Sequence, residues 1–132
     1  MKILKNRSLE KRLGNLISRD KQKGYESFFL TAGNIYKIIS PASIDFSGKE
    51  YIPSDRELIL PTKENPEDAY GWWKLSAGTY ILEWNEVLTP SPQMYAQILP
   101  ASFLLENGVF HPNLFLPLSE GACSKKLNVP FV

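Results

Sequence analysis

Ten prolines spread along the 132 residues are the feature that most limits how this chain can fold. Proline lacks a backbone donor and interrupts helices, so this spacing argues against long helices. Between the prolines lie short runs rich in aromatic and β-branched residues, which are typical of strands. These runs are 27–30, 35–39, 57–60, 79–84 and 94–99. We therefore expect a mainly β domain of short strands, arranged as a small sandwich or barrel.

The N-terminal end has a different pattern. The apolar residues of 8–17 fall on one helical stripe, and Ser8 precedes them in the position of an N-cap. Gly14 lies inside this stretch and weakens a helix there by roughly 1 kcal/mol. The sequence predicts one short amphipathic helix before the strands begin.

Charge is distributed unevenly. Residues 1–24 carry eight Lys or Arg and two acidic residues, a balance of +6, whereas the rest carries seven basic and twelve acidic residues, a balance of −5. One interpretation is a solvated helix face docked on an acidic body. The other is an arm that binds phosphate or a polyanion. The first is favoured because aromatic residues do not alternate with the basic ones. A net charge of +1 gives no general reason to expect nucleic acid or a membrane as partner.

The numbers of cysteines and histidines exclude internal disulfides and clustered Cys/His metal sites. Cys123 is the single cysteine and His111 the single histidine, so no internal disulfide and no Cys/His zinc cluster is expected. No apolar run approaches the ~20 residues of a membrane span. Charged residues interrupt any signal-peptide core. We therefore expect a cytoplasmic protein without a protein-held metal.

Four local features have a structural interpretation. Asp45 follows a proline-led segment, where a carboxylate commonly caps a turn. Residues 62–68 are expected to form an exposed loop. Of the adjacent Trp72 and Trp73, one ring is expected in the core and the other at an interface. Ser102 is either the N-cap of a helical turn ended by a left-handed Gly108, or part of an anion site made by that turn.

Three segments in order resemble one family. They are "ISPASID" (39–45), "WKLSAGTYILEWNEVLTP" (73–90) and "ILPASFLLENGV" (98–109). Together they are similar to motifs of the dUTPase and dCTP deaminase superfamily, which hydrolyses or deaminates deoxynucleoside triphosphates. The resemblance covers roughly residues 8–110. It implies a single domain of the β-clip type over 1–132, with 1–24 as a basic helical arm. It also implies a homotrimer with active sites at subunit contacts.

The resemblance implies a chemistry as well. Mg²⁺ would be held largely by the triphosphate and water. In dUTP hydrolysis a carboxylate orients water onto the α-phosphorus, giving dUMP and pyrophosphate. In dCTP deamination a glutamate acts on the water that attacks the ring, without zinc.

The phosphate-binding motif is matched only in part. Ser102 stands at the first serine of the motif and offers its hydroxyl and backbone N–H, and Gly108 is retained. Ala101 replaces the motif's arginine and Phe103 its second serine, so the substrate-binding positions keep their backbone pattern and lose charge. Glu106 stands where the deaminases have a second arginine.

The tail over 110–132 diverges from the family. Leu116 stands at the expected aspartate, and the family's closing segment does not follow. Glu120 is the candidate replacement for the missing catalytic carboxylate, and Asp45 is a second candidate.

Two main hypotheses follow from this pattern. The first is a dUTP diphosphatase-like nucleotidohydrolase with divergent catalytic residues. The second is a catalytically silent relative that forms a nucleotide-binding or protein-interaction trimer. A third and weaker one is a nucleic-acid binder that uses the basic arm.

Overall fold

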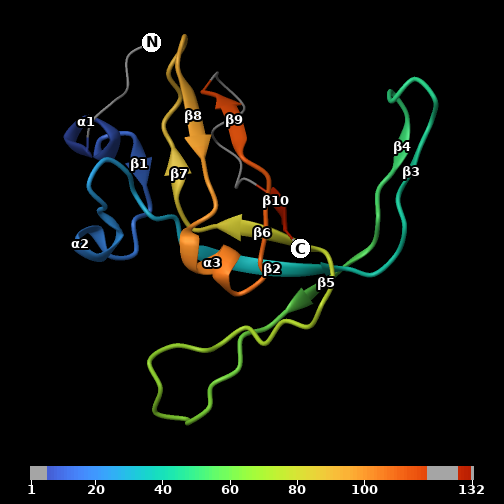
Figure 1. Cartoon of the computed structure of the whole chain (residues 1–132), viewed down its shortest axis with the longest axis horizontal. Helices are drawn as coiled ribbons and strands as arrows, with labels where there is room; N and C mark the ends of the chain where they lie inside the picture. Colours follow the sequence, from blue (N-terminus) through green and yellow to red (C-terminus); the bar gives the residue numbers. More distant parts are fainter. Residues whose placement is uncertain (1–5, 119–127, 132) are drawn as a thin grey trace.

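A computed structural model describes residues 6–118 and 128–131, with side chains over 8–118 (Figure 1). Strands account for 32% of the chain and helices for 11%, which confirms the mainly β class. In chain order the elements are α1 (Asn6–Glu10), β1 (Leu13–Gly14), α2 (Arg19–Gln22), β2 (Ala32–Ile38), β3 (Ser43–Ile44), β4 (Tyr51–Ile52), β5 (Arg56–Ile59), β6 (Tyr80–Trp84), β7 (Val87–Leu88), β8 (Tyr95–Ile98), α3 (Ser102–Glu106), β9 (Leu114–Pro117) and β10 (Asn128–Phe131).

The strands form four small antiparallel sheets. The largest has the order β10-β6-β2-β5, and the others are the pairs β1–β7, β3–β4 and β8–β9. Over the described residues these sheets do not close into a barrel, so that part of the prediction is wrong. The physical reason is strand length, because prolines and turns end most strands after two to five residues. Strands this short pair with one or two neighbours and leave the sheet open.

Two groups of buried apolar side chains hold the sheets together. The first is centred on Ile35 of β2 and Tyr80 of β6, and the second on Leu88 of β7 and Leu118. Partly buried residues pack around the first group: Ile59, Trp73, Leu75, Leu82 and Val109. Leu13, Met94 and Ala96 pack around the second. The first group therefore joins β2 to β6, and the second joins the N-terminal segment to β7 and β8.

Of the two adjacent tryptophans, Trp73 is confirmed as the core ring, and an interface at Trp72 stays a prediction. Trp73 packs against the first group, and its indole N–H donates to the backbone oxygen of Ile59 at 3.0 Å. Trp72 remains 62% exposed on the loop that follows β5. The same strand-end segment thus supplies one ring to the core and one to the surface.

The predicted N-terminal helix is wrong beyond Glu10. Residues 13–14 leave the helix and pair with β7 as β1, and Asn15 has a positive φ of 59°. The chain turns directly after α1, where the N–H of Arg12 donates to Leu9 O at 2.9 Å, and Leu13 packs on the second apolar group. Ser8 lies inside α1 and does not cap it. The described part of the chain contains no helix with the length and apolarity needed to cross a bilayer.

Four of the five predicted strand runs are confirmed, as β2, β5, β6 and β8. The fifth, 27–30, forms a single bridge between Phe28 and Lys23. Its neighbouring backbone is used differently, because the oxygen of Phe29 accepts from the side chain of Gln22 and the N–H of Thr31 donates to Glu86. The remaining bonds of this segment are short-range backbone bonds, from the Gly24 N–H to Ser27 O and from the Phe29 N–H to Gln22 O, both at 2.8 Å.

Candidate functional site

The turn that resembles a phosphate-binding motif is α3 with its flanks. Ala101 has extended backbone (φ −69°, ψ 145°), and its carbonyl accepts the first bond of the helix from the N–H of Leu104 at 3.0 Å. Ala101 is therefore the N-cap, and the prediction that Ser102 caps the turn is wrong. Ser102 is the first helical residue, and no side chain caps this end. Its hydroxyl-bearing side chain is exposed.

The C-terminal end of α3 has the predicted geometry. Gly108 adopts φ +72°, the left-handed conformation that glycine takes without strain. Its N–H donates to Leu105 O at 3.1 Å, while the N–H of Val109 donates to Leu104 O at 2.8 Å. This pair of bonds is a Schellman motif. Val109 then packs on the first apolar group, so the motif anchors α3 to the body.

The surface of the turn is apolar and carries one negative charge. Phe103 is 58% exposed beside Ser102, and Glu106 is exposed one turn later. Charge-assisted bonds to phosphate are the strong ones, and the turn's own side chains supply no cation for them. The turn is thus a short helix closed by a Schellman motif, and its surface does not favour a polyanion.

Asp45 lies at the end of the β3–β4 hairpin, where it caps the connecting turn. Its carboxylate accepts from the Ser47 hydroxyl at 2.5 Å, from the Ser47 N–H at 3.2 Å and from the Glu50 N–H at 3.0 Å. Gly48 provides the positive φ (70°) that the turn requires. These contacts confirm the turn-capping interpretation. The Ser47 hydroxyl bond, followed by the Glu50 N–H, lowers the pKa of Asp45 below 3.8.

Replacing Ser47 by alanine is expected to raise the pKa of Asp45 toward its ordinary value, because the largest stabilising contact of the carboxylate is lost. A carboxyl-detected NMR titration measures both values. A depressed folded-state pKa stabilises the turn above the unfolded pKa, and that contribution disappears as pH falls through the folded value. Ser43→Ala, a serine of the same hairpin, is the control. An unchanged pKa in Ser47→Ala contradicts the assignment.

Of the predicted site residues that the structure describes, Asp45 lies apart from the turn that contains Ala101, Ser102, Phe103 and Gly108. The β3–β4 hairpin with Asp45 projects from one end of β2, whereas α3 with Ser102 lies near the other end (Figure 1). Glu120 lies outside the described residues. Leu116 is part of β9, opposite Ala96 of β8. Across residues 8–118, no three His, Cys, Asp or Glu side chains are grouped as metal ligands would be.

The glutamate of the second motif, Glu86, has a structural role. It is 6% exposed, and its two carboxylate oxygens accept from the Gln22 amide at 2.6 Å and from the hydroxyl and N–H of Thr31 at 2.6 and 2.9 Å. Asn85 donates in turn to the Thr31 hydroxyl at 3.0 Å. This network ties α2 and the segment before β2 to the β6–β7 turn. Sequence reasoning missed Gln22 and Thr31, which no local pattern marks.

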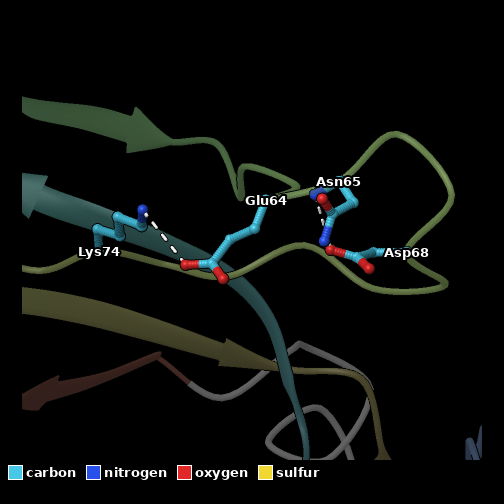
Figure 2. A network of polar contacts seen from close by, with 4 residues as sticks. All are labelled: Glu64, Asn65, Asp68 and Lys74. Atoms are coloured by element: carbon cyan, nitrogen blue, oxygen red, sulfur yellow. Dashed lines mark hydrogen bonds and ion pairs between the residues drawn. The ribbon is translucent and has the colours of Figure 1, made fainter.

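The loop over 62–72 confirms the expected exposed loop and contains a shallow depression of about 300 Å³. The depression is lined by Glu64, Asn65, Asp68, Ala69, Tyr70 and Trp72. Figure 2 shows the polar contacts beside it: Lys74 pairs with Glu64 at 3.6 Å, and Asp68 accepts from the backbone N–H of Asn65 at 2.9 Å. None of the three family-like segments contributes a residue to its lining.

Part of the positive charge of the N-terminal segment is paired with a carboxylate of the same segment. Arg19 of α2 forms an ion pair with Glu10 of α1, within the same segment. The backbone oxygen of Arg12 accepts from Thr89 at 2.7 Å, which fastens the segment to the body. These contacts fit a docked segment, and binding of a polyanion stays a prediction.

No known protein family, no curated protein and no solved structure matches this chain. The likeness to the dUTPase and dCTP deaminase superfamily therefore rests on the three sequence segments and their order.

Proposed function

We propose that this protein is a self-assembling relative of the dUTPases and dCTP deaminases whose chain does not itself hydrolyse or deaminate nucleotides. It would act as a homotrimer that binds a nucleotide or another protein. The observation that carries the assembly is its surface. The chain exposes 10,035 Å², whereas a compact monomer of its 15.0 kDa mass exposes about 7,000 Å². A difference of about 3,000 Å² is in the range that an obligate assembly covers.

The α3 turn supports the absence of hydrolysis. Phosphoryl chemistry needs positive groups where charge develops in the transition state. The turn presents Ala101, Phe103 and the negative Glu106 around Ser102 instead. Asp45, one candidate base, already accepts three hydrogen bonds from its own turn. A carboxylate held in this way is poorly placed to orient water.

Hydrolysis of dUTP to dUMP and pyrophosphate is the second candidate. The observation that favours it is the Schellman motif at Gly108, which holds Ser102 in a fixed and exposed turn. In this case Mg²⁺ enters with the triphosphate and is held by phosphate oxygens and water. A neighbouring subunit would then have to supply the cationic groups that this turn lacks.

We expect purified protein given Mg²⁺ and either dUTP or dCTP to release no pyrophosphate and to form no deaminated nucleotide above a protein-free blank. Sedimentation equilibrium is expected to give three times the 15.0 kDa mass of one chain. Turnover that disappears in Ser102→Ala and persists in Ser54→Ala, a serine remote from the turn in sequence, would establish the hydrolase instead. A monomeric mass would overturn the assembly.

A further inference from the structure

The β3–β4 hairpin, residues 40–55, is an arm that extends away from the body (Figure 1). Its two strands pair with each other and with no other described strand. Ile44, Tyr51 and Ile52 are each at least 69% exposed, and Phe46 at the tip is fully exposed. A lone two-stranded hairpin is at best marginally stable in water. These exposed apolar side chains indicate that the arm packs against another protein surface.

Each face of the paired strands carries at least one large apolar side chain. In the antiparallel pair Ile44 lies opposite Tyr51, and Ser43 lies opposite Ile52. Opposite residues share a face, so Ile44 and Tyr51 occupy one side and Ile52 the other. Clustered large apolar side chains on a surface mark an interaction site, whereas single ones do not.

A matching surface lies on the outer face of the β8–β9 sheet. Tyr95 and Gln97 of β8 lie opposite Pro117 and Phe115 of β9, and all four are exposed. The alternate residues of both strands turn inward. This outer face is uncharged, and its two strands pair only with each other among the described elements. In Figure 1 the arm and the β8–β9 sheet stand apart, so one chain does not bring them together.

We propose that the arm of one copy docks on the outer face of the β8–β9 sheet of a second copy. The inference rests on the proposed self-assembly and identifies the two surfaces that form the contact between copies. A second copy is the partner because the chain exposes about 3,000 Å² more than a compact monomer, several times the ~800 Å² that each partner covers in a standard interface. An arm and a receiving face at different places make a head-to-tail contact, and a rotation of about 120° between successive copies closes such contacts into a trimer.

Cross-linking between differently tagged chains tests the contact. With Cys123 replaced by serine, one chain carries Phe46→Cys or Ile52→Cys and the other carries Phe115→Cys. The two are mixed in urea, reassembled and treated with a short bismaleimide. The expected product joins the arm chain to the Phe115→Cys chain. In the matched control the arm cysteine is replaced by Tyr70→Cys, on another loop, where the native side chain is about as exposed as that of Ile52. This control is expected to give no cross-link to the Phe115→Cys chain.

A second variant measures the contribution of the arm to assembly. Ile44→Thr with Ile52→Thr keeps β propensity and removes apolar surface from both faces of the arm. Neither residue belongs to the two buried apolar groups, so folding, followed by circular dichroism, is expected to persist. The dissociation constant for self-association is expected to rise at least tenfold.

The outcomes separate this inference from the proposed assembly. A wild-type trimer that persists unchanged in Ile44→Thr/Ile52→Thr, without the mixed cross-link, overturns arm docking and leaves the assembly standing. A wild-type monomer overturns both. A cross-link formed only within one chain, or an arm that binds lipid vesicles or another protein while the trimer stays intact, also overturns docking on a second copy.

Discussion

Tyr80→Ala is expected to lower the free energy of unfolding by about 4 kcal/mol, because it removes a large ring from a close-packed site. Tyr80 is 3% exposed and packs with Ile35 between β6 and β2. Its hydroxyl also donates to the backbone oxygen of Ser76 at 2.7 Å, which holds the segment before β6. The midpoint of thermal unfolding, measured at fixed protein concentration, should fall by roughly 15 °C.

Two controls separate the contributions to this effect. Tyr80→Phe keeps the ring and loses the hydroxyl bond, so it should cost about 1 kcal/mol. Tyr70→Ala removes a tyrosine that is 75% exposed, and its effect should stay within about 0.5 kcal/mol. If Tyr80→Ala lowered stability no more than Tyr70→Ala, then the Ile35–Tyr80 group would not be the core of the large sheet.

Glu86→Gln is expected to lower the free energy of unfolding by about 3 kcal/mol, although it preserves side-chain volume. Both carboxylate oxygens of Glu86 already accept bonds, from the Gln22 amide, the Thr31 hydroxyl and the Thr31 N–H. An amide has one oxygen, so its NH₂ group must face a donor. Gln22 cannot turn to relieve the conflict without losing the bond that its own oxygen accepts from the Ser18 N–H. Thermal unfolding should shift down by roughly 10 °C.

Glu83→Gln is the matched control for this substitution. Glu83 lies three residues earlier on β6 and accepts one bond, from the Asn34 amide at 2.8 Å. A glutamine can offer its oxygen to that donor, so stability should change by less than about 1 kcal/mol. Equal losses in Glu86→Gln and Glu83→Gln would show that the Glu86 network contributes no more than an ordinary surface hydrogen bond.

Local patterns predicted the parts of the fold that depend on local chemistry. The prolines and β-branched runs located β2, β5, β6 and β8. Gly108 and Asp45 were assigned to turns because a left-handed conformation and a cap each require a particular residue type. These assignments needed no knowledge of what lies across the chain.

The failures occurred where distant partners compete with local preference. Residues 13–17 have a helical stripe, but pairing with β7 and burial of Leu13 outweigh the marginal propensity of a stretch that contains Gly14. Residues 27–30 have strand composition, yet they form a single bridge, and the oxygen of Phe29 accepts from the side chain of Gln22. Ser102 has the chemistry of an N-cap, but the first helical bond ends on the carbonyl of Ala101.

The sequence by itself determined a mainly β chain of short strands and a helical turn ended by a left-handed Gly108. Only the tertiary structure decided that Glu86 is a buried structural acceptor, since its partner Gln22 lies 64 residues away. It also decided that the β3–β4 hairpin and α3 lie apart on one chain (Figure 1). Contacts across such separations depend on strand pairing and register, which local composition does not encode.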